Sequence, residues 1–239
     1  MPTYVLTGSN RGLGLEFVRQ LSKSDNIIFA GVRSLSGEVD ELKSLASSSK
    51  ANIHIFEADY ASPPSLDSFS KRVISTLSGS KIDILINNAG INAVPQQTAM
   101  NIEPSDLHTH VDINVIGPAL LTAHLAPHLA KGGVVVDMTS GLGSMGKGVV
   151  KCTTYAISKA ALNMLAVHQA EELKTQGVRV VLMDPGWVKT RMGGTEALIT
   201  ADESITNQLS TIEKVHQGKD GGELGKARFY NNDGTEVPW

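Results

Sequence analysis

The chain has 239 residues, of which 41% are hydrophobic and 19% charged, and its formal net charge at pH 7 is −3. This composition is ordinary for a globular protein and excludes global disorder. The absence of a basic cluster argues against a nucleic-acid or anionic-membrane partner, because recognition of either needs concentrated positive charge.

In chain order, short runs rich in Val and Ile alternate with longer amphipathic runs. The short runs have the length and composition of strands buried on both faces, and the longer ones have helical spacing of their apolar residues. Alternation of this kind predicts a parallel sheet covered by helices on both sides. We predict strands at 3–7, 27–32, 52–57, 82–87, 134–138, 178–183 and 227–230, and helices at 13–21, 39–45, 66–77, 112–129 and 155–173.

No linker rich in Pro or Gly divides the chain, so we expect a single domain over residues 1–239. The one long irregular region, at about 190–225, contains an amphipathic piece near 203–215. A long excursion late in such a fold predicts a substrate flap.

Localisation is indicated by what the sequence lacks. The single cysteine, Cys152, cannot form an intramolecular disulfide, and the first residues do not have the pattern of a signal peptide. The apolar runs are far shorter than the roughly 20 residues that span a bilayer. We therefore expect a cytoplasmic protein without a membrane partner.

A glycine-rich turn follows the first predicted strand, in the sequence Thr7-Gly8-Ser9-Asn10-Arg11-Gly12-Leu13-Gly14. Glycines between a strand and a helix allow a tight turn and let the backbone approach a phosphate, which the helix N-terminus attracts. The spacing is G-x3-G-x-G rather than the standard dinucleotide fingerprint. The turn predicts a dinucleotide site, with a plain glycine-rich turn as the alternative.

Tyr155 and Lys159 are four residues apart and so share one face of the predicted helix. A free tyrosine has a pKa of about 10, and a neighbouring ammonium group would lower it toward the range useful for acid–base chemistry. The alternative is an ordinary pair on a helix surface.

These features, together with Asn87-Asn88-Ala89-Gly90, Asn114, Ser140 and Asp184-Pro185-Gly186-Trp187-Val188-Lys189-Thr190, fall at strand ends or on the helices that follow them. In this order they resemble the short-chain dehydrogenase/reductase family over essentially the whole length. The resemblance implies a single Rossmann-like, doubly wound parallel sheet of about seven strands. It also implies interconversion of a carbonyl and an alcohol with NAD(P). Residues 185–194 and 229–239 are similar to the sniffer-type and C-factor-like carbonyl reductases.

The resemblance implies a role for each of four catalytic positions. Tyr155 would be the general acid, Lys159 would lower its pKa and bind the nicotinamide ribose, and Ser140 would orient the carbonyl. Asn114 would hold a relay water. Ser140 precedes Tyr155 by slightly more than the family's usual spacing, so Ser144 is kept as an alternative.

The cofactor is expected to be NADP(H). An NAD site places an acidic residue after the second strand, whereas this chain has Arg33 there, and Arg11 in the glycine turn adds a second cation. Asp59 matches the position that contacts adenine. The expected cofactor-binding residues are Gly8, Asn10, Arg11, Gly12, Leu13, Arg33, Asp59, Tyr60, Asn87, Ala89, Gly90, Tyr155, Lys159, Pro185, Gly186, Val188 and Thr190.

The leading function is therefore NADPH-dependent reduction of a ketone or aldehyde, with a small carbonyl or alcohol as the partner. The alternatives are a non-catalytic NADP-binding sensor and a sugar-nucleotide epimerase or dehydratase, and the latter needs a further substrate domain. No metal is expected, because Pro127 lies between His124 and His128 and no Cys or Glu completes a site. His108 and His110 are expected in a loop, and Cys152 is expected to have no role.

Helices 112–129 and 155–173 are apolar on more than one face. In many members of the resembled family these two helices pair with their copies in a second chain. Together with the apolar pattern, this predicts a homodimer or homotetramer.

Overall fold

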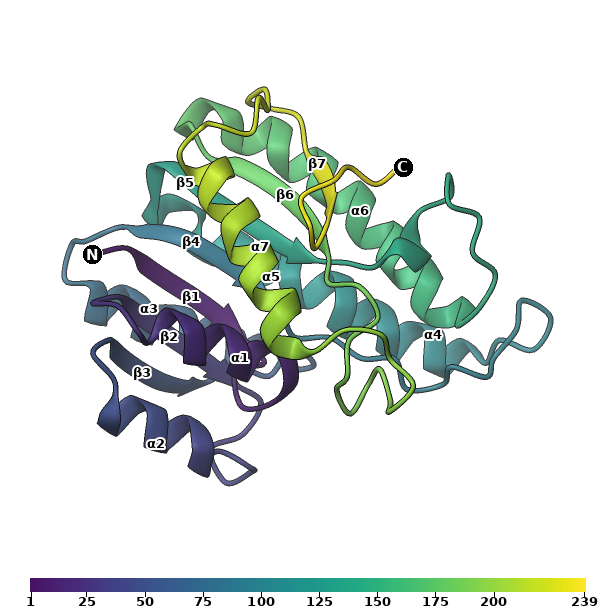
Figure 1. Cartoon of the computed structure of the whole chain (residues 1–239), viewed down its shortest axis with the longest axis horizontal. Helices are drawn as coiled ribbons and strands as arrows, with labels where there is room; N and C mark the ends of the chain where they lie inside the picture. Colours follow the sequence, from purple (N-terminus) through teal and green to yellow (C-terminus); the bar gives the residue numbers. More distant parts are fainter.

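Seven strands form one sheet in which every neighbouring pair is parallel. The computed structural model describes residues 1–239, and the strand order is β3-β2-β1-β4-β5-β6-β7 (Figure 1). The predicted fold class is confirmed. The strands are β1 (Thr3–Thr7), β2 (Ile27–Val32), β3 (Asn52–Glu57), β4 (Ile82–Asn87), β5 (Leu129–Met138), β6 (Arg179–Asp184) and β7 (Arg228–Asn231).

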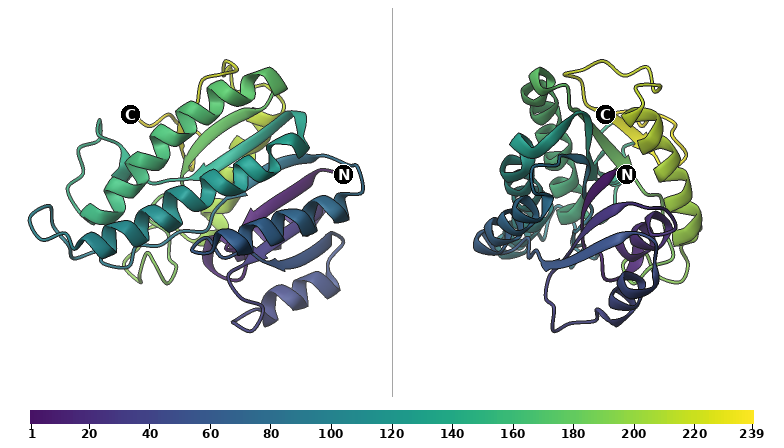
Figure 2. Two further views of the ribbon diagram at one scale, coloured as in Figure 1. Left: turned by 180° about the vertical axis from the view of Figure 1, so that it is seen from behind. Right: turned by 90° about the vertical axis from the view of Figure 1, so that its left-hand side faces the viewer.

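Helices cover both faces of the sheet, as a parallel sheet requires. In the left view of Figure 2 the helices α3 to α6 lie in front of the sheet, whereas α7 lies behind it. The helices are α1 (Gly12–Leu21), α2 (Asp40–Ser48), α3 (Pro63–Leu77), α4 (Pro104–Val111), α5 (Gly117–Leu125), α6 (Thr153–Leu173) and α7 (Ala201–His216).

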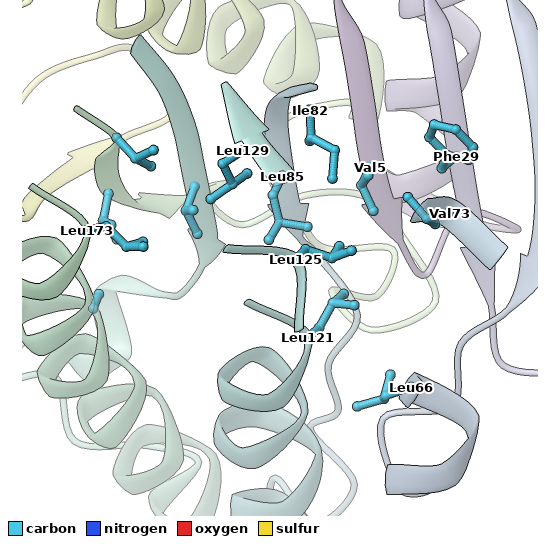
Figure 3. Close-up of a cluster of buried hydrophobic side chains, with 14 of the residues drawn as sticks. Val5, Phe29, Leu66, Val73, Ile82, Leu85, Leu121, Leu125, Leu129 and Leu173 are labelled. Atoms are coloured by element: carbon cyan, nitrogen blue, oxygen red, sulfur yellow. The ribbon is translucent and has the colours of Figure 1, made fainter. Parts of the chain in front are cut away.

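Two hydrophobic cores, one on each face, hold these layers together. Because successive strand residues point to opposite faces, Leu85 lies in the core beneath α3, α5 and α6, which Figure 3 shows, and Ile86 lies in the core beneath α1, α2 and α7. Phe69 and Leu121 complete the first core, and Phe17 is buried in the second. The inner strands β1, β2, β4, β5 and β6 are therefore largely apolar on both sides, whereas the edge strands β3 and β7 carry polar residues.

The prediction of one helix over 112–129 followed by a strand at 134–138 was wrong at both junctions. The region begins with a π-helical turn at Asp112–Ile116, continues as α5, and ends in a short 3-10 turn at Ala126–His128. Strand β5 then begins at Leu129, which pairs with Ile82 before the register shifts. Gly132, with φ of +84°, allows the extra residues in β5 to bulge, so the apolar pattern before Val134 is interrupted.

Helix α4 was not predicted, and the expectation that His108 and His110 lie in a loop was wrong. Pro104 occupies the first turn of this helix, where a missing N–H costs nothing. His110 is fully buried, and its Nε2 accepts a hydrogen bond from the backbone N–H of Ala93 at 3.2 Å. This histidine thus holds the loop after β4 against α4.

The predicted flap at about 190–225 was too long. It includes α7, whose side chains Ile205, Ile212 and Val215 are buried in the core on the second face of the sheet. Thr200 caps this helix by accepting a hydrogen bond from the N–H of Glu203 at 3.2 Å. Residues 187–200 come before this helix and are outside both cores, although Val188 and Ala197 are buried.

All seven strands end at the same edge of the sheet, and the order of strands reverses between β1 and β4. Parallel sheets bind ligands in the crevice outside such a reversal. The glycine turn after β1 and the Asn87–Gly90 stretch after β4 meet there, since a Cβ built on Gly8 would lie 3.1 Å from Cα of Ala89. No helix of the structure combines the length and apolarity needed to cross a membrane.

Candidate active site

The four residues predicted to be catalytic lie at this edge on three different elements. Ser140 follows β5 and accepts a hydrogen bond from the N–H of Leu142 at 3.2 Å, so it begins a short 3-10 turn. Tyr155 and Lys159 share one side of α6, with Nζ of Lys159 5.6 Å from the centre of the Tyr155 ring. Asn114 comes from the π-helical turn before α5.

Lys159 is an almost fully buried ammonium group, with 4% of its surface exposed. Its Nζ donates a hydrogen bond to the carbonyl oxygen of Met138 at 2.7 Å. Burial lowers the pKa of Lys159 to about 8, although the Asp137 carboxylate opposes this decrease. The charge is therefore retained at neutral pH.

Tyr155 is a half-buried phenol whose pKa lies above its ordinary value. Burial is the main cause, the Asp184 carboxylate adds to the increase, and the Ser140 hydroxyl opposes it. The Lys159 ammonium group directs its hydrogen bond to the backbone of β5, and its expected lowering of the Tyr155 pKa stays a prediction. At neutral pH the phenol keeps its proton and is available as a donor.

Asn114 is fully buried, and its side-chain amide is occupied by protein partners. Oδ1 accepts a hydrogen bond from the N–H of Ile91 at 2.8 Å, while Nδ2 donates to the oxygen of Ile91 and to Oγ of Ser158, both at 2.9 Å. Ser158 in turn donates to the backbone oxygen of Tyr155 at 2.7 Å. Asn114 thus links the loop after β4 to the helix that carries Tyr155, and a water held by Asn114 would have to use its main-chain carbonyl.

The glycine turn has the close contacts that a phosphate cradle needs. A Cβ at Gly14 would lie 2.0 Å from the carbonyl oxygen of Gly8, so only glycine allows α1 to approach β1 this closely. Gly8 and Gly12 have φ of +67° and +53°, which favours glycine at both. No side chain caps the first turn of α1, so its N–H groups remain available to an anion.

A groove of about 350 Å³ lies beside this turn. Arg11 in its lining and Arg33 directly after β2 are exposed, and all ion pairs of the chain involve other residues. Two of the three acidic residues in the lining are paired, since Glu38 binds Arg191 at 3.0 Å and Glu41 binds Arg19. The lining residues are Asn10, Arg11, Gly12, Leu15, Glu38, Asp40 and Glu41.

Some residues predicted to bind cofactor have side chains in the protein interior instead. The hydroxyl of Tyr60 donates to Oδ1 of Asn87 at 2.8 Å, and Thr7 donates to the Tyr60 oxygen at 2.9 Å. Asn87 donates its two amide hydrogens to Thr122 and Asp137. These side chains join four elements and steady the sheet beneath the crevice. Asp59 lies at the edge, where it accepts a hydrogen bond from the N–H of Ala61 at 3.0 Å.

The turn after β6 closes the other side of the crevice. Gly186 has φ of +79°, and its N–H donates to Oδ1 of Asp184 at 3.0 Å. Val188, which is buried, forms an isolated bridge with Ile199. Thr190 lies opposite the glycine turn, since its Cγ2 would be 3.6 Å from a Cβ on Gly12. Of this tract, Thr190 lies next to Gly12 and Gly186 lies next to Ile199 and Asn232, and their cofactor contacts stay a prediction.

Ser144, the alternative to Ser140, is buried and bonded to the end of the chain. Its hydroxyl donates to the oxygen of Pro238 and accepts from the N–H of Lys147 at 3.0 Å. The N–H of Gly146 also donates to a Trp239 oxygen at 2.6 Å. Ser144 therefore anchors the segment between Ser140 and Tyr155, and Ser140 is the serine whose hydroxyl faces the phenol.

Sequence reasoning missed three polar residues that support the site. Ser158 bridges Asn114 and Tyr155, Asp137 lies beneath Lys159, and Asp184 acts on the Tyr155 phenol. For Asp137 a signal was present, because it is an acidic residue inside the apolar run Val134-Val135-Val136-Asp137-Met138. Cys152, directly before α6, has φ of +51°, an uncommon conformation for a residue with a side chain.

Comparison with known proteins adds to this geometry. The model of the family described as short chain dehydrogenase matches residues 2–198. The C-signal protein of Myxococcus xanthus is 34% identical over 161 residues, which cover 66% of this chain and 93% of that protein. The short-chain dehydrogenase anuI of Penicillium roqueforti is 30% identical over 253 aligned residues, covering 100% of this chain and 98% of its own.

Two solved structures are similar over the whole fold. The NADPH-bound carbonyl reductase from chicken fatty liver superimposes with a TM-score of 0.90 at 31% identity, covering 100% of this chain and 99% of that one. The carbonyl reductase Sniffer of D. melanogaster has a TM-score of 0.90 at 28% identity, with 100% of both chains covered.

Proposed function

The chain belongs to the short-chain dehydrogenase family, and from that premise we propose that it reduces a ketone or aldehyde to an alcohol with NADPH. One observation carries the proposal. A protonated phenol, Tyr155, lies beside a buried ammonium group and the Ser140 hydroxyl, at the edge of the sheet where the glycine turn opens. The similarity to carbonyl reductases, one of them NADPH-bound, supports the same reaction.

The residues of the crevice fit a dinucleotide. The uncapped first turn of α1 and the Gly8–Gly14 contact would accept the pyrophosphate. Arg33 and Arg11, exposed and without ion-pair partners, would bind the 2′-phosphate that distinguishes NADPH from NADH. We propose that Asn10, Leu13, Asp59, Ala89, Gly90, Pro185, Gly186, Val188 and Thr190 line the rest of the site, and that Tyr60 and Asn87 act by supporting the sheet.

The protein's own groups would then complete the reduction. NADPH, when bound, supplies the hydride for the carbonyl carbon. Ser140 would hold the carbonyl oxygen, and Tyr155 would donate its proton to that oxygen as negative charge develops. Lys159 would bind the nicotinamide ribose and oppose the charge left on the phenol. Asn114 would keep α6 in register with the loop after β4.

Residues 187–200 supply a flap of suitable length for this site. Met192 and Leu198 are 54% and 77% exposed, so their apolar side chains are available to cover a bound substrate. Closure over an apolar carbonyl compound would exclude water from the reacting atoms. The ion pair of Arg191 with Glu38 joins this segment to the loop after β2, across the groove. We place the protein in the cytoplasm, with a small-molecule substrate and no nucleic-acid partner.

A spectrophotometric screen tests this function. The protein is mixed with NADPH and a series of aldehydes, ketones and diketones, and the absorbance of the reduced nicotinamide is followed. We expect it to fall with at least one class of carbonyl, and far more slowly with NADH. Tight NADPH binding without any turnover would instead favour the non-catalytic NADP-binding alternative.

A further inference from the structure

Asp137 is a carboxyl group buried beneath the active site without a complete set of partners. It lies on β5, on the same face as Val135, which packs in the core beneath α5 and α6. None of its surface is exposed. Oδ1 accepts a hydrogen bond from Nδ2 of Asn87 at 2.8 Å, but Oδ2 has no hydrogen-bond partner. A buried carboxylate in this state is unfavourable unless a positive charge compensates it.

Lys159 is the positive charge that compensates it. Its Nζ is bonded to the carbonyl oxygen of Met138, the residue that follows Asp137. Burial raises the pKa of Asp137 to about 6, and the Lys159 charge opposes this increase. In the other direction, the Asp137 charge opposes the decrease in the pKa of Lys159. Each charged form therefore stabilises the other, although Lys159 directs its hydrogen bond to the backbone.

We propose that Asp137 is a positioning residue that keeps Lys159 in its ammonium form from inside the sheet. This rests on the proposed function, in which Lys159 serves Tyr155 and the cofactor. A lysine in so dry a site loses its proton readily, and a fixed carboxylate on the neighbouring strand extends the pH range over which it stays charged. Because none of the surface of Asp137 is exposed, it would act only through Lys159.

No other charged group of the site stabilises the ammonium form of Lys159. Burial and Asp137 are the two influences on the pKa of Lys159. The Asp184 carboxylate acts on Tyr155 and is paired with Lys147 at 3.7 Å. The titratable groups next to the pair are Tyr60, which is influenced by Asp137, and Tyr155, whose ring lies beside Lys159. Asp184 and Cys152 act on Tyr155. The neutral neighbours are Asn87, bonded to Asp137, and Asn114, which lies beside Gly90 as Lys159 does.

The direct test is the substitution Asp137→Asn, which keeps the shape and removes the charge. We expect the alkaline limb of kcat against pH to move to lower pH by about one unit, because without the nearby negative charge Lys159 loses its proton at lower pH. On the acidic side of the profile kcat should stay within about twofold of wild type. Thr122→Val is the matched control, since it removes the other acceptor of the Asn87 amide without a change of charge. Its pH profile should match wild type.

A second measurement reports on Lys159 without relying on turnover. The ε-carbon of Lys159 is followed by ¹³C NMR, with its resonance assigned by its absence in Lys159→Arg. In the wild type we expect two inflections, one near pH 6 as Asp137 titrates and one near pH 8 as Lys159 does. In Asp137→Asn the first should vanish and the second should fall.

These outcomes separate the two proposals. If no carbonyl is turned over, the proposed function fails, but the NMR titration still tests Asp137. Identical Lys159 titrations in wild type and Asp137→Asn would overturn the role of Asp137, as would a single inflection in the wild type. If Asp137→Asn does not fold, the wild-type titration alone tests the role of Asp137. Two inflections support that role and a single inflection overturns it.

Discussion

At the scale of single residues, the site depends on contacts between polar side chains that are far apart in the sequence. Tyr155 and Lys159 were predictable because their spacing places them on one side of a helix. Asp137 stands out in sequence as an acidic residue in an apolar run, but its significance was not predictable, because it comes from Asn87, 50 residues away in the sequence, and from Lys159 on another element. Ser158 is similar, since a serine on a helix acquires a role only when Asn114 is placed against it.

The preference for NADPH over NADH is predicted to depend on Arg33. Replacing it with aspartate should reduce kcat/KM for NADPH by about 10- to 100-fold and change the value for NADH little, because a charge-assisted hydrogen bond contributes about 1.5–3 kcal/mol. The exposed Lys43 on α2 provides a control with the same change in charge, Lys43→Asp. A wild-type protein that prefers NADH would contradict the assignment of Arg33.

At the scale of elements, the strands were predicted more accurately than the helices. Strands β1 to β4 have the predicted bounds because buried parallel strands are uninterrupted apolar runs. The start of β5 was missed because a bulge at Gly132 breaks that pattern. Helix α4 was missed because its sequence, Pro-Ser-Asp-Leu-His-Thr-His-Val, has few apolar residues and is recognised only by its N-terminal proline.

The flap gives a prediction at this scale. Amide hydrogen exchange in residues 187–200 should slow when NADPH and an alcohol product bind, since closure buries the Trp187 to Leu198 region. The amides of α7 should be protected with and without ligand, because Ile205, Ile212 and Val215 are fixed in the core. Fast exchange throughout α7 in the free protein would mean that the flap extends to about residue 225, as the sequence predicted. Unchanged exchange at 187–200 on ligand binding would argue against any flap.

At the scale of the whole molecule, the first core buries one side of α6, including Leu162 and Leu173, but other apolar side chains of this helix remain at the surface. Ile157, Met164 and Val167 on this helix are 41%, 58% and 38% exposed, and Ile116 on the adjoining π-helical turn is 42% exposed. On α6 their spacing forms one stripe. A continuous apolar stripe on the surface is typical of an interface between proteins.

We therefore expect a homodimer or larger assembly through α6. Light scattering at micromolar concentration should give at least twice the mass of one chain, and Met164→Glu should reduce it to a monomer. Met100→Glu is the control, because Met100 is 94% exposed in the loop before α4, away from this stripe. A monomer in the wild type would refute the prediction.

The central claim is that Tyr155 donates the proton in carbonyl reduction, and Tyr155→Phe tests it most directly. The substitution keeps the ring and removes only the hydroxyl, so NADPH should bind with a Kd within about threefold of wild type. Turnover should fall by about 10²- to 10⁴-fold, the usual contribution of a general acid. Wild-type kcat in this variant, measured at saturating NADPH and carbonyl, would contradict the account.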